Sequence, residues 1–135
     1  MSTSTRAINP WNWQDAYGFS QAVEVDGARR WLVCAGQTSV DAEGRPLHEG
    51  DMVAQLNQAL DNLGAVLTRA GLGFADVVRL NYYTTDIPAY LAASGEAARR
   101  FATAGRPMPA GTLLGVAALF HPDILIEIEA TACGS

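Results

Sequence analysis

The feature that most constrains the fold is an alternating segment near the C-terminus of the sequence. Apolar residues occupy every second position, namely Ile124, Ile126, Ile128, Ala130 and Ala132. This period of two, rich in β-branched residues, predicts a strand whose apolar face packs on helices. Glu127 and Glu129 share the opposite face with Leu125. Two carboxylates on one face of a central strand need solvent, a partner chain or a ligand site.

Size and charge restrict the class of protein. The 135 residues fit one domain, 1–135, and 49% apolar with 17% charged residues indicates a globular chain. The net charge is −5 and the nine basic residues are scattered, so we expect no nucleic-acid partner. The low charge leaves much of the surface apolar, which predicts a buried subunit interface.

Missing apolar segments and the few cysteines and histidines predict where the protein is located, the state of its thiols and whether it binds a metal. No apolar signal core opens the chain and no window approaches 18 apolar residues, so we expect a cytoplasmic protein with no membrane contact. Cys34 and Cys133 lie in strand-like segments, where buried free thiols are the expectation and a disulfide is the alternative. His48 and His121 lack further ligands at metal-binding spacing, so no metal site is predicted.

The remaining pattern predicts the order ββ-α-β-α-ββ. Residues 1–15 suggest an irregular lead-in, in which Trp11 and Trp13 cover a core edge or wall a pocket. The predicted elements are strands over 17–25 and 30–35, a helix over 51–70, a strand over 77–85, a helix over 89–104, and two last strands. One mixed sheet with both helices on one face is the natural packing, and other copies of the chain would bury the other face.

An ordered set of short motifs covers nearly the whole chain. They are Gly18-Phe19-Ser20-Gln21-Ala22-Val23, Ala35-Gly36-Gln37, Gln58-Ala59-Leu60-Asp61-Asn62-Leu63, Ala70-Gly71-Leu72, Val77-Val78-Arg79, Thr85-Asp86, Pro109-Ala110 and Ile126-Glu127-Ile128-Glu129-Ala130. The set resembles the Rid (reactive intermediate deaminase, YjgF) family. The resemblance implies a chorismate-mutase-like α/β fold and a homotrimer with small-molecule clefts between subunits. It also implies hydrolysis of imines and enamines to a keto acid and ammonia, without a metal or organic cofactor.

The family's site residues map onto five positions. Glu129 matches the glutamate that positions water, which can also pass protons as the carbinolamine collapses. The Gly36 backbone N–H resembles a family contact near the ligand. Phe19 stands where the family has a cleft tyrosine, and Leu113 where a cysteine is common. Gly111 occupies the position of the arginine that binds the substrate carboxylate.

The missing arginine changes the expected ligand. Loss of one partner of a desolvated charge pair costs about 2–5 kcal/mol, so a 2-imino acid should bind poorly unless Arg79, Arg106 or a partner chain compensates. We therefore expect a neutral, larger and more apolar or aromatic ligand. Phe19, Leu113, Trp11, Trp13, Tyr82 or Tyr83 could line its cleft, although Phe19 and Leu113 fit a core role equally well. Glu127 is interpreted as a structural partner for a backbone N–H or an arginine.

Three functions follow in order of support. The first is a hydrolytic deaminase of imine, enamine or related metabolites, with its cleft altered away from 2-imino acids. The second is a trimer that binds a small metabolite without turnover. The third, an endoribonuclease like some relatives, is disfavoured by the acidic chain and the lack of paired histidines.

Overall fold

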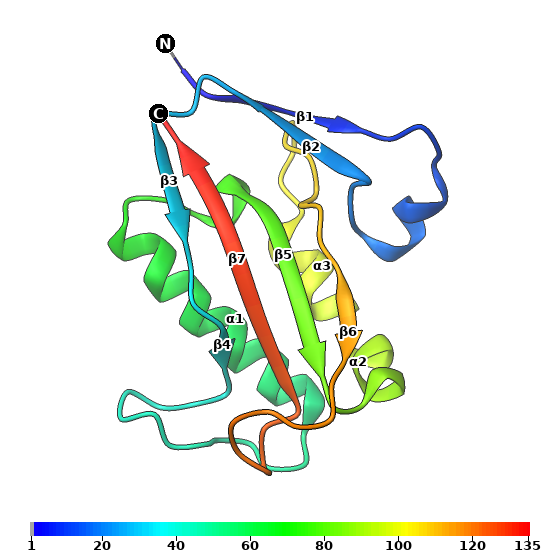
Figure 1. Ribbon diagram of the computed structural model, residues 1–135, viewed down its shortest axis with the longest axis vertical. Helices are drawn as coiled ribbons and strands as arrows, with labels where there is room; N and C mark the ends of the chain where they lie inside the picture. The colour runs from blue at the N-terminus through cyan, green and yellow to red at the C-terminus, as the bar shows by residue number, and fades with distance from the viewer. Residues whose placement is uncertain (1) are drawn as a thin grey trace.

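A computed structural model describes residues 2–135 of the chain (Figure 1). Its elements are β1 Ser4–Ile8, η1 Trp13–Tyr17, β2 Ala22–Asp26, β3 Arg30–Val33, β4 Gln37–Thr38, α1 Met52–Arg69, η2 Phe74–Asp76, β5 Val77–Thr84, α2 Ile87–Ala93, α3 Gly95–Phe101, β6 Leu113–Gly115 and β7 Ile126–Gly134.

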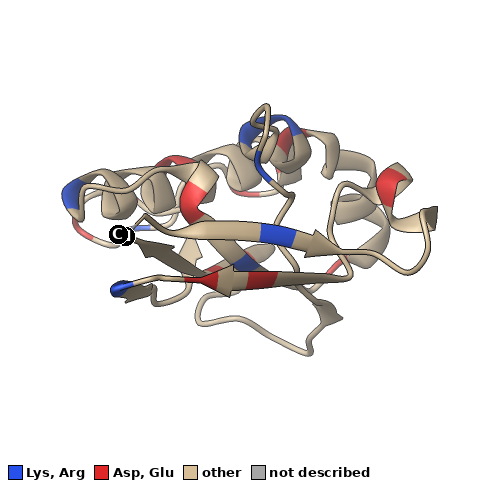
Figure 2. Ribbon diagram, turned by 90° about the horizontal axis from the view of Figure 1, so that it is seen from above, with Lys and Arg blue, Asp and Glu red and all other residues tan. Residues whose placement is uncertain are grey.

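The main sheet has the strand order β3-β7-β5-β6, with β4 also paired to β7. The pairs made by β7 are antiparallel, whereas β5 and β6 run parallel, so the sheet is mixed as predicted. The helices form a layer on one face of the strands (Figures 1 and 2). The charged residues in Figure 2 are spread over separate elements, which agrees with the scattered basic residues of the sequence.

Strand β7 is the centre of this sheet, and its alternation is confirmed. Ile126 and Ile128 are fully buried, while Glu127 and Glu129 on the opposite face are partly exposed. The apolar stripe of α1 packs in the same core, with Leu56, Leu60, Leu63 and Leu67 fully buried. The polar side chain of Gln55 on α1 also enters this core. Its amide donates a hydrogen bond to the Asp123 carbonyl and accepts one from the Leu125 N–H, just before β7.

The N-terminal prediction was wrong in two respects. Residues 4–8 form a strand, and β1 pairs antiparallel with β2 in a separate two-stranded sheet, so the expected single sheet is divided. The strand predicted from residue 17 begins only at Ala22, because Trp13–Tyr17 form a 3-10 turn and Gly18 adopts a left-handed φ of 72°. The polar strand β1 carries no apolar alternation, so its sequence gave no strand signal.

The second helix also differs from its prediction. Asp86 caps its start by accepting a hydrogen bond from the Ala89 N–H at 3.0 Å, so α2 begins at Ile87. The helix is interrupted at Ser94, whose hydroxyl bonds the Leu91 carbonyl at 2.9 Å, and α3 begins at Gly95. The first of the two last predicted strands is reduced to the three residues of β6.

Two smaller expectations concern cysteines and helices. Cys34 and Cys133 are buried and free, as expected, so the disulfide alternative is excluded. Over residues 2–135, none of the helices is both long and apolar enough to cross a membrane.

Candidate functional site

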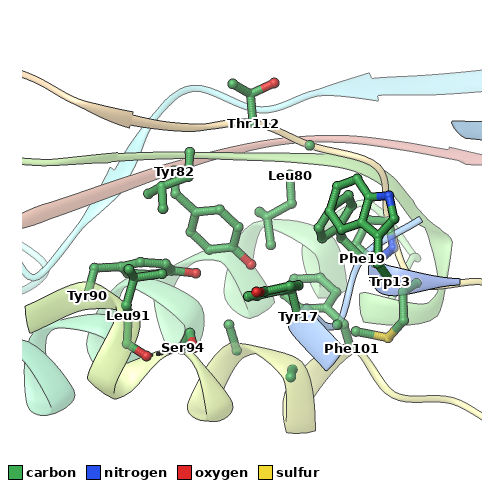
Figure 3. A pocket seen from close by; sticks show the side chains of 17 residues that line it. Trp13, Tyr17, Phe19, Leu80, Tyr82, Tyr90, Leu91, Ser94, Phe101 and Thr112 are labelled. Atoms are coloured by element: carbon green, nitrogen blue, oxygen red, sulfur yellow. Dashed lines mark hydrogen bonds between the residues drawn. The ribbon is translucent and has the colours of Figure 1, made fainter. Parts of the chain in front are cut away.

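A cavity of about 340 Å³ lies between the η1 segment, the α2–α3 layer and strands β5 and β6 (Figure 3). Three of the five predicted site residues line it, namely Phe19, Gly111 and Leu113. Phe19 and Leu113 are partly buried at the cavity wall, and Leu113 also packs against the hydrophobic core. We call this cavity the aromatic pocket.

Aromatic side chains dominate the walls of the aromatic pocket. Trp13 meets Phe19 edge to face with 5.7 Å between ring centroids, and meets Tyr17 in the same way at 6.3 Å. At the opposite end, the ring centroids of Tyr82 on β5 and Tyr90 on α2 lie 5.0 Å apart. Burial raises the pKa of Tyr90 to about 12 and raises that of Tyr82, so both hydroxyls keep their protons at neutral pH.

Gly111 lies so close to β5 that its position has no room for a side chain. A Cβ built on Gly111 would lie 1.9 Å from the carbonyl oxygen of Leu80. Backbone hydrogen bonds on either side hold the Gly111 segment against β5. The Leu80 N–H donates to the Ala110 carbonyl at 2.8 Å, and the Tyr82 N–H donates to the Thr112 carbonyl at 2.8 Å. An arginine could occupy this position only if the strand moved away from β5.

Glu129 is held on the opposite face of the sheet by two side chains of β5. The Tyr83 hydroxyl donates a hydrogen bond to the Glu129 carboxylate, and the Asn81 amide donates to the same oxygen at 3.1 Å. The pKa of Glu129 is lowered, first by the Tyr83 bond and then by Asn81, with a smaller effect from the charge of Arg79. Glu129 is therefore an ionised, oriented carboxylate at neutral pH.

The neighbouring carboxylate, Glu127, has the opposite electrostatic environment. Its pKa is raised, mainly by burial and further by the charge of Glu129. Its side chain lies against Gly36, where an added Cβ would stand 2.2 Å from the Glu127 Oε1 atom. Glu127 takes part in none of the ion pairs of residues 2–135, so the expected arginine partner is absent from this part of the chain. Gly36 thus makes room for a carboxylate.

The sheet separates the two halves of the predicted site. Leu80 and Tyr82 point from β5 into the aromatic pocket, whereas Asn81 and Tyr83 point to the Glu129 side. Figure 3 shows Thr112 directed away from Tyr82 across the strands. Within one chain, Phe19, Gly111 and Leu113 therefore share one region, and Glu129 and Gly36 lie on the other face.

The structure also places the other residues considered from sequence. Trp13 and Tyr82 line the aromatic pocket, while Tyr83 belongs to the Glu129 face. Arg79 is exposed on the Glu129 face, but Arg106 lies within 3.4 Å of Asp76 on η2 and does not approach that face's carboxylates. Asn81 was missed, because only the pairing of β5 with β7 brings it opposite Glu129. No cluster of three His, Cys, Asp or Glu suited to a metal occurs within residues 2–135.

The fold and the site together define a small α/β protein with a carboxylate on the open face of a mixed sheet. The family described as Endoribonuclease L-PSP matches residues 12–133. The chain therefore belongs to the Rid/YjgF family, also called the endoribonuclease L-PSP family.

Individual relatives agree with this assignment. The crystal structure of YyfB from Yersinia pestis, described as a Rid-family protein of unknown function, matches with a TM-score of 0.86 and 41% identity, over 96% of this chain and 98% of that one. Protein DfrA of Myxococcus xanthus is 37% identical over 84% of this chain and 83% of its own length. A 2-iminobutanoate/2-iminopropanoate deaminase of Capra hircus is 34% identical over 84% of this chain and 78% of its own length.

Proposed function

We propose that the protein is a hydrolytic deaminase that acts on the C=N bond of a neutral imine or enamine, with Glu129 as the catalytic residue. The observation that carries this proposal is the contrast between two family positions. Glu129 is present, ionised and oriented by Tyr83 and Asn81. Gly111 replaces the carboxylate-binding arginine in a backbone that leaves no space for a side chain.

The reaction needs one water and one proton carrier. The Glu129 carboxylate accepts a proton from the water as the oxygen attacks the C=N carbon, and passes that proton to the nitrogen to give a carbinolamine. Glu129 then accepts the hydroxyl proton of the carbinolamine and passes it to the amine, so that ammonia leaves as the C=O bond forms. The sum is one imine and one water giving one carbonyl compound and one ammonia. The lowered pKa of Glu129 keeps the carboxylate ionised at the start of each cycle.

The proposal includes a homotrimer of single 1–135 domains, with small-molecule clefts between subunits. Because the sheet separates the aromatic pocket from Glu129 in one chain, a ligand in the pocket can meet only the Glu129 of a neighbouring subunit. Exposed apolar side chains on the Glu129 face support such contacts. Trp31 and Val33 are 55% and 80% exposed, and they pair with Cys133 and Thr131 of β7.

A second candidate is deamination of a 2-imino acid, as the name of the goat relative states for that protein. Arg79 favours this candidate, because it is exposed on the Glu129 face and near enough to lower the pKa of Glu129. Arg79→Gln would then abolish activity on 2-imino acids and spare neutral imines. Binding without turnover and RNA cleavage remain the alternatives, and the net charge of −5 argues against the latter.

The test compares two imine sources at equal flux. An amino-acid oxidase generates 2-imino acids and an amine oxidase generates neutral imines, while ammonia release reports hydrolysis. We expect acceleration with neutral imines, and a loss of about 10²- to 10⁴-fold in Glu129→Gln. Sedimentation measures the oligomeric state. No acceleration from either source, or full activity in Glu129→Gln, would refute the enzyme proposal; RNA cleavage that copurifies with the protein would favour the ribonuclease.

A further inference from the structure

The aromatic pocket has a polar end inside an otherwise apolar cavity. Figure 3 shows the hydroxyl groups of Tyr17, Tyr82 and Tyr90 directed toward the same part of the cavity. These hydroxyls come from three separate elements, η1, β5 and α2. Burial keeps the phenols of Tyr82 and Tyr90 protonated, and the Tyr82 hydroxyl interacts with that of Tyr90, which leaves the Tyr90 O–H to donate a hydrogen bond to a ligand.

The charge of the lining is equally informative. Among the residues that the structure describes, no Asp, Glu, Lys, Arg or His lines the aromatic pocket. A ligand carboxylate placed there would lose its water without gaining a cation, whereas a neutral carbonyl or imine would gain hydrogen bonds. The volume of about 340 Å³ lies within the range of small-molecule sites and accommodates one ring with a short side chain.

We propose that the aromatic pocket binds neutral ketones and aldehydes that carry an aromatic ring, whose carbonyl oxygen accepts a hydrogen bond from Tyr90, beside Tyr82, while the ring packs against Phe19 and Leu113. This inference rests on the proposed function, because such compounds are the products of neutral imine hydrolysis. It goes further in naming the substrate class, an aryl-substituted imine without a carboxylate, and in placing its recognition on the helix side of the sheet.

Methionine methyl groups provide a direct readout of binding. The chain has three methionines; Met108 lines the aromatic pocket, whereas Met52 is buried at the start of α1 and does not line it. The full chain with ¹³C-labelled methionine methyl groups is titrated with phenylacetone, and with phenylpyruvate, in which a carboxylate replaces the methyl group. We expect phenylacetone to shift the Met108 resonance and leave Met52 unmoved, and phenylpyruvate to bind at least about tenfold more weakly.

Two variants locate the ligand within the pocket. Tyr90→Phe keeps the ring and should weaken phenylacetone binding about three- to tenfold, the range for one lost neutral hydrogen bond. Leu113→Trp should fill the cavity and abolish the Met108 shift. Phe120→Tyr, an aromatic change at an exposed residue outside the pocket, should leave the affinity unchanged. Melting curves identify any variant that fails to fold. In that case the comparison of phenylacetone with phenylpyruvate in the unmodified protein still tests the proposal.

The outcomes separate this inference from the proposed function. A Met108 shift with phenylacetone but no imine hydrolysis supports the binding site and refutes the enzyme. Hydrolysis of neutral imines without a Met108 response, and with full affinity in Tyr90→Phe, refutes the binding site alone. Phenylpyruvate binding as tightly as phenylacetone also overturns the inference. So does a Met108 resonance that phenylacetone does not shift because a second copy of the chain fills the pocket.

Discussion

The tight approach of Gly111 to β5 predicts a large effect from one added methyl group. In Gly111→Ala the new Cβ would lie 1.9 Å from the Leu80 carbonyl oxygen, and protein Cβ atoms essentially never approach a heavy atom within 3.0 Å. The two segments must therefore separate by about 1.1 Å at this point. That movement would lengthen two backbone hydrogen bonds, from the Leu80 N–H to the Ala110 carbonyl and from the Tyr82 N–H to the Thr112 carbonyl, which are both 2.8 Å long.

The expected cost follows from overpacking a tight site, about 2–3 kcal/mol. For a chain of 135 residues, 1 kcal/mol changes the melting temperature by roughly 3–5 °C. Gly111→Ala should therefore melt about 6–15 °C below the unmodified protein. Gly95→Ala is the matched control, because a Cβ there meets nothing within 4 Å at the start of α3. We expect Gly95→Ala to melt at or slightly above the unmodified protein.

Calorimetry or circular dichroism on the three proteins at one concentration decides the matter. If Gly111→Ala melts within about 1 °C of Gly95→Ala, the close approach to Leu80 is wrong. The argument that no side chain fits at this position would then fail. A Gly111→Arg variant that stays stable and gains affinity for a 2-oxo acid would contradict the same reasoning from the functional side.

Three further predictions concern residues that the structure ties to the site or core. Tyr83→Phe should raise the pKa of Glu129, because it removes the largest cause of its lowering, and the acid limb of the rate–pH profile should move to higher pH; an unmoved limb would contradict the role of Tyr83. The pKa of Glu127 is raised in the folded protein, so its favourable contribution is complete below the unfolded value of about 4.5 and is lost as pH rises through the folded value. Glu127→Gln should therefore melt higher than the unmodified protein at pH 7 and equally at pH 3.5, and an equal shift at both values would rule out the charge as the cause. Gln55→Leu should lose about 2–4 kcal/mol in urea unfolding, because the fully buried amide makes three hydrogen bonds to the backbone, and a loss below about 1 kcal/mol would show that these bonds are replaced.

Much of the fold was predictable because its signals are local. The alternation of residues 124–132 determined the central strand and the face that carries Glu127 and Glu129, since successive side chains of a strand point to opposite faces. The apolar stripe and the Asp51 cap likewise determined α1. The failures, at β1 and at the break between α2 and α3, lie in segments with short or polar patterns.

The site shows the limit of the sequence more clearly. Residue identity alone predicted that Gly111 stands where the family has its arginine and that Glu129 matches the family's glutamate. Only the pairing of β5 with β7 brings Asn81 and Tyr83 to Glu129, across sequence separations of 48 and 46 residues. Only the tertiary structure puts Gly111 against Leu80 and the aromatic pocket on the far side of the sheet from Glu129. Register and contact between distant segments depend on the packing of the whole domain, which no local pattern encodes.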